Sequence, residues 1–299
     1  MYKILLTMIG ILAAVYLVLT LADVNSEYMI EKRFWQIEAR YKDVVRDQGF
    51  LPKGTSAQMV DELEEFIAHY PQSSLVAKAR LNLAMIYVLE ENHASAKLIL
   101  EDIIRQYPQQ PELGVAAARQ LIAIYEQEKN IPQVVLTYQE VLKRFPLTEF
   151  GLRIPLLLAQ FYIEQGEMPQ AKAAYEQAIE YYWQIIKEDQ QSEISFKALN
   201  LLATAYVMQA QWADAVDVFG QILLNYTDTK QLDSKKIDQV IKSINIISVN
   251  KLEDYAQAIH IYEGFLEKYP DHELSTKIQG VVRGFKKLNS PAAVIGEKI

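Results

Sequence analysis

The stretch ILEDIIRQYPQQ, residues 99–110, contains the feature that decides the fold. Its apolar residues have helical spacing, and the run stops at Tyr107-Pro108. Proline has no N–H and restricts the residue before it, so a helix should end here. The same mark follows similar runs elsewhere in the chain, at Tyr70-Pro71, Phe145-Pro146 and Tyr269-Pro270. Pro71, Pro108 and Pro146 are 37 and 38 residues apart, which indicates one structural unit copied several times.

Upstream of each mark, apolar positions recur at fixed offsets. In residues 77–108 they are Leu83-Ala84, Tyr87, Ala96, Leu100, Ile103 and Pro108. Corresponding sets occupy residues 115–146, 152–183 and 196–227. A half copy ends at Pro71, and a weaker copy ends at Pro270, with its first-helix positions at Ile246 and Val249. Several full or partial copies at one period predict a repeat array.

A small residue opens the second half of most copies: Ala96, Ala171, Ala215 and Ala258. A small side chain allows two helices to approach closely, and the residue four positions later lies on the same helical face. This pattern resembles the tetratricopeptide repeat, a helix–turn–helix unit of about 34 residues. The resemblance implies an all-α fold, an α-solenoid of antiparallel helix hairpins that binds other proteins.

Two copies depart from the pattern. Trp183 stands where the repeat has proline, so the helix that contains it should run one or two turns longer. Pro155 lies early in another helical run, so that helix should begin near Arg153 or kink there. In Tyr181-Tyr182-Trp183, the three side chains cannot all face one side of a helix. The sequence favours core packing over an exposed aromatic patch.

We expect four segments along the chain. Residues 1–25 form a membrane anchor or signal segment, and 26–55 form a capping helix with an apolar stripe followed by a loop over 48–55. Thr55 and Gln58 suggest a capping box at the next helix. Residues 56–288 form the repeat array, with about five full units plus flanking half-units and a closing helix over 272–288. Residues 289–299 form a loose tail.

The N-terminus predicts contact with a membrane. Residues 4–22 carry no charge, and at about 1.5 Å per residue they span roughly 28 Å, near the hydrocarbon thickness of a bilayer. Lys3 precedes this run, and Asp23 and Glu27 follow it, which favours a single-pass segment with the bulk of the chain outside the cytoplasm. The alternative is a signal peptide that is cleaved after Ala22, which leaves the rest of the chain secreted to the periplasm.

Composition argues against several functions. The 299 residues carry a net charge of −8, which disfavours nucleic acid, and they contain no cysteine. No motif for a nucleotide, a catalytic serine or a zinc protease is present, and the four histidines lack metal-ligand spacing. We therefore expect no enzymatic activity, no cofactor, no metal and no small-molecule substrate.

Function should then lie on the faces of the first helices, which line the concave groove in repeat arrays. The repeat register places basic and amide side chains there. The candidate peptide-binding residues are Lys78, Asn82, Met85, Arg119, Gln120, Arg153, Gln160, Lys197 and Asn200. They could bind an acidic peptide or a C-terminal carboxylate. The alternative is that these residues only keep a solvated groove soluble.

The style of the repeats is similar to that of bacterial envelope proteins, such as the tol–pal-associated repeat protein and the repeat lipoprotein of outer-membrane β-barrel assembly. The acylated cysteine of that lipoprotein is absent here. The resemblance implies a scaffold at the inner membrane that supports assembly or maintenance of an envelope protein complex. Two alternatives are a structural accessory subunit of a multi-subunit membrane complex and a periplasmic translocon-associated chaperone.

Overall fold

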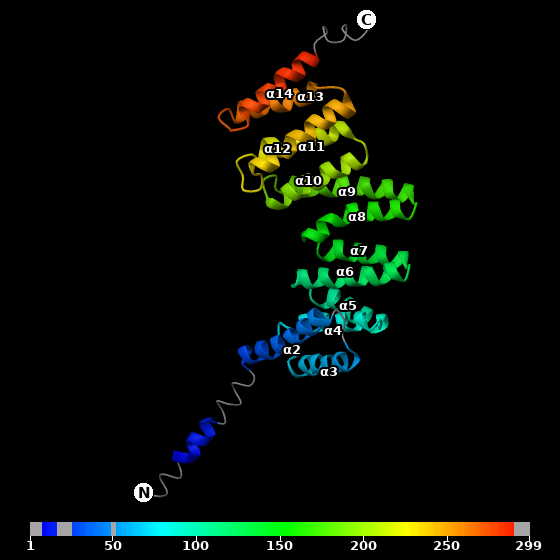
Figure 1. Ribbon diagram of the computed structural model, residues 1–299, viewed down its shortest axis with the longest axis vertical. Coiled ribbons are helices and arrows are strands. Elements are labelled where there is room, and N and C mark those ends of the chain that lie inside the picture. The colour runs from blue at the N-terminus through cyan, green and yellow to red at the C-terminus, as the bar shows by residue number, and fades with distance from the viewer. Residues whose placement is uncertain (1–7, 17–25, 49–51, 290–299) are drawn as a thin grey trace. The chain divides into compact units, whose positions relative to one another are not determined.

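The computed structural model describes residues 8–16, 26–48 and 52–289. All secondary structure in these ranges is helical. The helices fall into two compact units, the first ending at Thr148 and the second beginning at Glu149, and each is described by itself. The expected all-α fold of helix hairpins is confirmed for the described residues (Figure 1).

The first unit is a series of helices joined by short connections. They are α2 (Glu27–Gln48), α3 (Lys53–His69), α4 (Val76–Leu89), α5 (His93–Gln106), α6 (Pro111–Gln127) and α7 (Ile131–Arg144). Each of α3 to α6 packs against the next helix in the chain. The apolar stripe expected on α2 is present, since Phe34 and Ile37 pack with Met59, Leu63 and Phe66 of α3. Ion pairs from Arg33 to Glu65 and from Arg40 to Glu62 show that α2 and α3 run antiparallel.

The second unit continues the helical hairpins. Its elements are α8 (Glu149–Glu164), α9 (Met168–Glu188), α10 (Glu193–Met208), α11 (Trp212–Tyr226), α12 (Ser234–Ile247), the π-helical turn η1 (Ser248–Leu252), α13 (Ala256–Lys268) and α14 (Ser275–Leu288). The closing helix expected over 272–288 is confirmed as α14. A continuous apolar core runs from α9 to α14.

The aromatic-proline marks end helices as expected. The cap residues Tyr70, Tyr107, Phe145 and Tyr269 share φ values from −120° to −131° and ψ values from 44° to 60°, outside the helical region. In each case the N–H of the aromatic residue still bonds the carbonyl four residues earlier. The following proline disfavours a further helical residue, so the helix stops at the same point in each copy.

The small residues of the repeat lie at close helix contacts. Ala96, Ala215 and Ala258 are fully buried, and Ala171 is 3% exposed. Gly114 of α6 is a further close contact, because a Cβ at this position would collide with the ring of Phe145. The predicted role of small side chains in the hairpins is therefore confirmed.

Of the predictions for the copies that depart from the repeat, two are confirmed and one is wrong. Helix α9 has 21 residues against 14 in α5 and in α7, so its predicted extension is confirmed. Tyr182 is fully buried, and Tyr181 and Trp183 pack against the same core, as core packing predicts. The expected start of α8 near Arg153 is wrong, since α8 begins at Glu149 and contains Pro155. The Tyr182 hydroxyl donates to the carbonyl of Leu152 in this turn, at 2.8 Å.

The predicted loop over 48–55 is wrong at its two ends, since Gln48 lies in α2 and residues 53–55 lie in α3, while residues 49–51 lie outside the described residues. The predicted capping box is also wrong. Helix α3 already begins at Lys53, with Pro52 as its N-cap residue and no side-chain cap, so Thr55 lies inside the helix. Pro52 has φ of −61°, close to the helical value, and it therefore prepares the chain for a helix directly after it. The sequence signal for the start of the helix was the proline rather than Thr55.

The register drawn through the weaker last copy is also wrong on its first helix. Ile246 is 57% exposed and Val249 is 41% exposed, whereas Ile244 and Ile247 are buried. The chain there passes through the π-helical turn η1. A π-turn contains one residue more than an α-turn, so positions counted back from Pro270 at α-helical spacing fall on the wrong face.

The N-terminal prediction is only partly within the described residues. Residues 8–16 are helical, with Met8, Ile11, Leu12 and Tyr16 exposed. Residues 1–7 and 17–25 of the expected anchor, and residues 290–299 of the expected tail, lie outside the described ranges. In the described part of the chain, no helix has the length and apolar character needed to cross a membrane.

Candidate functional site

A groove between α5, α6 and α7 is the candidate site of the first unit. It encloses about 260 Å³. Ile104, Leu121 and Leu136 line it with apolar surface, and Glu101 and Tyr125 contribute polar atoms. Leu136 is 53% exposed at the rim. The groove is therefore open, mostly apolar, and supplied with a few polar groups, as ligand and peptide sites are.

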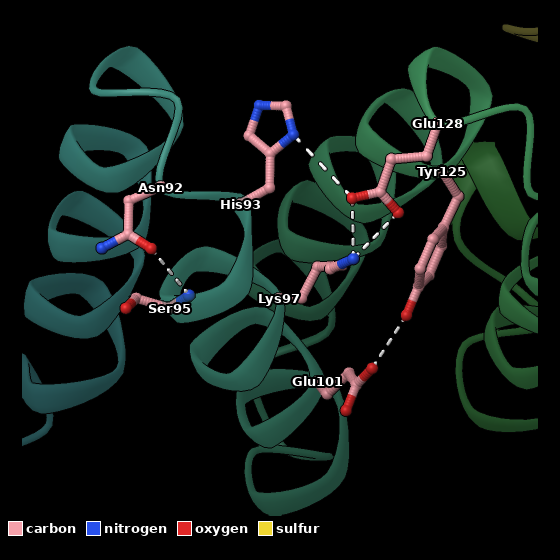
Figure 2. Close-up of polar contacts among 7 residues, drawn as sticks. All are labelled: Asn92, His93, Ser95, Lys97, Glu101, Tyr125 and Glu128. Atoms are coloured by element: carbon pink, nitrogen blue, oxygen red, sulfur yellow. Dashed lines mark hydrogen bonds and ion pairs between the residues drawn. The ribbon is translucent and has the colours of Figure 1, made fainter.

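The polar part of the groove is a tyrosine bonded to a carboxylate. The Tyr125 hydroxyl donates to Glu101 Oε1 at 2.9 Å, from α6 to α5 (Figure 2). Burial, this hydrogen bond and the charge of Glu128 together raise the pKa of Tyr125 to about 12. The phenol therefore stays protonated at neutral pH and continues to donate to Glu101.

A second polar cluster fixes the same two helices at one end of the groove. Lys97 Nζ lies 2.7 and 2.8 Å from the two carboxylate oxygens of Glu128, and 5.3 Å from the centroid of the Tyr125 ring. His93 Nδ1 lies 3.9 Å from Glu128 Oε1 (Figure 2). Glu128 caps the C-terminus of α6, where the positive charge of Lys97 is favourable. This cluster joins α5 to α6.

The basic residues around the groove are bound to other acids. Arg105 Nη2 lies 2.7 Å from Asp102 Oδ1, and Arg80 Nη1 lies 3.9 Å from Asp102 Oδ2. Arg144 pairs with Glu140 on its own helix. Among the described residues, Glu101 has no basic partner, and Tyr125 is its hydrogen-bond donor. The groove thus contains a carboxylate that is oriented but not neutralised.

An equivalent groove lies one repeat earlier, between α3, α4 and α5. It encloses about 320 Å³ and is lined by Glu64, Ile67, Ala68, Arg80, Leu83 and Ile99. Tyr87 occupies the repeat position of Tyr125, and its hydroxyl lies 3.5 Å from Glu64 Oε1, at the outer limit of a hydrogen bond. The first unit therefore repeats the same tyrosine–glutamate arrangement in two successive grooves.

The second unit has a hollow at the same repeat position, with different polar contacts. It encloses about 650 Å³ between α9, α10 and α11. Glu176 stands at the position of Glu101, but it lies 3.9 Å from Lys172 Nζ. Tyr206 stands at the position of Tyr125, but its hydroxyl accepts a hydrogen bond from Trp183 Nε1 at 3.0 Å. The tyrosine–glutamate pair is thus replaced in this unit.

The residues predicted from the first-helix faces fall in both units. Lys78, Asn82 and Met85 lie on α4, and Arg119 and Gln120 lie on α6. Lys78 Nζ pairs with the buried Glu38 of α2 at 3.1 Å and lies 4.2 Å from the centroid of the Trp35 ring. Lys78 therefore joins α2 to α4, in addition to any role in binding.

The remaining predicted residues lie in the second unit, on α8 and α10. Arg153 is exposed, and the Gln160 amide donates to Glu164 at 3.0 Å. Lys197 pairs with Glu193 at 2.7 Å, and the Asn200 amide donates to the carbonyl of Phe196 at 2.7 Å. The contacts of Gln160, Lys197 and Asn200 lie within their own helices. Their role in peptide binding stays a prediction.

Sequence reasoning missed the grooves on the second-helix side. The repeat pattern counts Tyr87 among its apolar positions and gives the glutamates no role. A signal was present, since glutamate follows the small-residue position by five residues at Glu64, Glu101 and Glu176. Which of these acids would have a lysine beside it could not be read from that spacing, because it depends on side-chain conformation.

Comparison with known proteins identifies the repeat. A family model for a tetratricopeptide repeat-like domain matches residues 3–201, and a tetratricopeptide repeat model matches residues 249–272. Comparison with curated proteins gives no match. Among solved structures, the crystal structure of BtubC (BKLC) from P. vanneervenii is 16% identical, covers 78% of this chain and 91% of its own, and has a TM-score of 0.40. Since the first model spans more than half of the sequence, the chain belongs to the tetratricopeptide repeat-like family.

Proposed function

We propose that this protein is a non-catalytic scaffold that binds another protein and is held at a membrane by residues 4–22. Tetratricopeptide repeats are protein-interaction domains, and the family match supports the first part of the proposal. The proposal also has more specific parts, which are the membrane anchor, the location outside the cytoplasm and the role in the cell envelope. They rest on the sequence.

The observation that carries the binding function is the open groove between α5, α6 and α7. Its apolar wall is exposed at Leu136, and its carboxylate at Glu101 has no basic partner among the described residues. Exposed apolar surface beside an oriented polar group is typical of protein-binding surfaces. The raised pKa of Tyr125 keeps its phenol protonated at neutral pH, so the Tyr125–Glu101 pair favours binding over nucleophilic catalysis.

The proposed membrane attachment is supported by the charge-free run of residues 4–22. Its length fits one crossing of a bilayer, and Lys3 on one side with Asp23 and Glu27 on the other supports a periplasmic repeat domain. Extraction of native membranes with alkaline carbonate tests this part. The full-length protein should stay in the membrane pellet, and its release into the soluble fraction would contradict the anchor.

Affinity purification of the full-length protein from gently solubilised native membranes tests the scaffold function. Mass spectrometry should identify at least one co-purifying envelope protein that an unrelated membrane protein does not retain. A single partner in near-equal amount would identify a dedicated complex, and several partners in smaller amounts would identify a transient scaffold or chaperone. Recovery of the protein alone, also after cross-linking in intact cells, would contradict the proposal.

A further inference from the structure

The first unit repeats one binding feature at a fixed interval. The grooves around Glu64 and Glu101 occupy equivalent positions in successive repeats, and each glutamate faces the tyrosine of the following first helix. Both grooves have an aliphatic lining, from Ile67, Leu83 and Ile99 in one and from Ile104, Leu121 and Leu136 in the other. Two copies of a groove imply a ligand that presents the same chemistry twice.

The charges around the grooves indicate the sign of that ligand. Arg80 and Arg105 both pair with Asp102, which lies on α5 between the two grooves. Neither Glu64 nor Glu101 has an ion-pair partner in the described part of the chain. A basic side chain that approaches either groove therefore meets an unneutralised carboxylate, and the whole chain, at −8, adds to the attraction.

Exposed leucines complete the surface. Leu98 of α5 is 68% exposed, and Leu136 of α7 is 53% exposed. Each stands two residues after the small-residue position of its repeat, so the two are equivalent. In the second unit, that position is Ala173 on α9, Asp217 on α11 and His260 on α13, and none of these is a leucine. The first unit alone thus combines the paired grooves with exposed leucines.

The helix that the two grooves share indicates the form of the ligand. One groove lies between α3, α4 and α5 and the other between α5, α6 and α7, so a ligand that reaches both must cross α5. An α-helix of about 18 residues is roughly 27 Å long and can reach from one groove to the other. A helix that crosses α5 could therefore place an apolar and a basic side chain in each groove.

We propose that the second-helix face of α3, α5 and α7 binds a basic amphipathic helix of a partner protein, with Glu64 and Glu101 pairing its Lys or Arg residues. This inference rests on the proposed scaffold function and adds the surface and the chemistry of the partner. The leucines Leu98 and Leu136 contact the apolar face of that helix. The acidic-peptide site expected on the first-helix faces is a separate surface.

A synthetic peptide tests the proposal directly. The probe is a fluorescein-labelled amphipathic helix of leucine and lysine, about 18 residues long, with a leucine–glutamate peptide as its control. Fluorescence anisotropy with the full-length protein in detergent, at about 0.1 M salt, measures binding. The lysine peptide should bind and the glutamate peptide should not. Absence of binding by the lysine peptide would overturn the proposal.

Matched variants distinguish binding at the two grooves from a general electrostatic attraction of the peptide to an acidic protein. Glu64→Gln/Glu101→Gln should weaken binding at least about tenfold, because it removes both groove charges. Glu126→Gln/Glu267→Gln removes two exposed acids elsewhere, gives the same net charge, and should change affinity less than about twofold. Equal losses in the two double variants would overturn the proposal.

A third variant tests the apolar contact at a position where a folding defect is not expected. Leu136→Ser changes an exposed side chain, should leave the melting temperature unchanged, and should weaken the peptide several-fold. Unchanged affinity in this variant would remove the apolar contact from the proposal.

The same variants distinguish this inference from the scaffold function. If the wild-type protein captures a membrane partner and Glu64→Gln/Glu101→Gln captures it equally well, the scaffold stands and the groove assignment is wrong. If capture is lost in the glutamine variant and kept in the Glu126→Gln/Glu267→Gln control, both stand.

Discussion

Tyr125 in the first unit and Tyr206 in the second stand at the same repeat position, but their hydroxyl groups have different partners. Tyr125 donates to Glu101 in an open groove, whereas Tyr206 accepts a hydrogen bond from Trp183. Trp183 stands where the other repeats have proline, and α9 continues through it. Replacing the proline lengthens the helix, and the longer helix supplies the tyrosine with an aromatic partner. The length of one helix thus decides which partner the tyrosine hydroxyl has at this position.

The largest expected effect comes from removing Trp183, which donates the hydrogen bond to Tyr206 in the second unit. Trp183→Ala should lower the free energy of unfolding by about 3 kcal/mol, since the indole packs on the core of the second unit. Leu136→Ala, in the exposed rim of the first unit, should cost less than about 0.5 kcal/mol. Chemical denaturation measures both values, and hydrogen exchange assigns the loss to a unit. Equal costs would contradict the contrast between the units.

A second test examines what the two units share. Ala96→Leu in the first unit and Ala215→Leu in the second place a large side chain at a fully buried helix contact. Each should cost about 1–3 kcal/mol through overpacking and lower the melting temperature. Thermal unfolding followed by circular dichroism measures the change. If both variants melt like the wild type, the repeat alignment is wrong.

Glycine substitutions give a smaller effect, with opposite signs in the two units. Gly114→Ala should destabilise the first unit by about 1–2 kcal/mol, because its Cβ collides with Phe145. Gly284→Ala in α14 meets nothing within 4 Å, and it should stabilise the second unit by roughly 0.5–1 kcal/mol through helix propensity. Denaturation midpoints provide the measurement. Stabilisation by Gly114→Ala would show that Phe145 does not pack against α6 in this way.

The smallest effect concerns the pH response of the groove tyrosine. Its pKa of about 12 lies above the ordinary value of 10, so the protonated phenol stabilises the fold below pH 10. This contribution should be lost as the pH rises from about 10 through 12. Glu101→Gln should lower the pKa of Tyr125. Subtracting the ultraviolet titration of Glu101→Gln/Tyr125→Phe from that of Glu101→Gln isolates the titration of Tyr125. An unchanged titration would remove Glu101 as a cause of the shift.

The sequence was sufficient for the hairpins because the repeat uses strong local signals. A proline after an aromatic residue ends a helix wherever it occurs, and a small residue marks a close contact in most copies. The wrong helix boundaries and the wrong register lie where two sequence signals competed or where no signal was present. Pro52 started α3 ahead of the expected Thr55 cap, α8 began at Glu149 rather than near Arg153, and the π-turn at Ser248–Leu252 shifted the last register.

The candidate site was less predictable than the fold. Periodicity places Tyr87 among the apolar positions of the repeat, but it does not give the direction of a hydroxyl group. It also placed Lys78 in a groove without showing that Glu38 on α2 pairs with it. The partner of a polar side chain depends on helices distant in sequence, so a one-dimensional pattern could not supply it.

Site-specific photocross-linking tests the central claim, that the first unit binds a protein partner through its second-helix face. Benzoylphenylalanine would replace Leu136 in the first unit and Ala173, its repeat equivalent, in the second unit of the full-length protein in native membranes. The account predicts a discrete cross-linked adduct from position 136 and none from position 173. Equal adducts at both positions, or an adduct from position 173 alone, would contradict it.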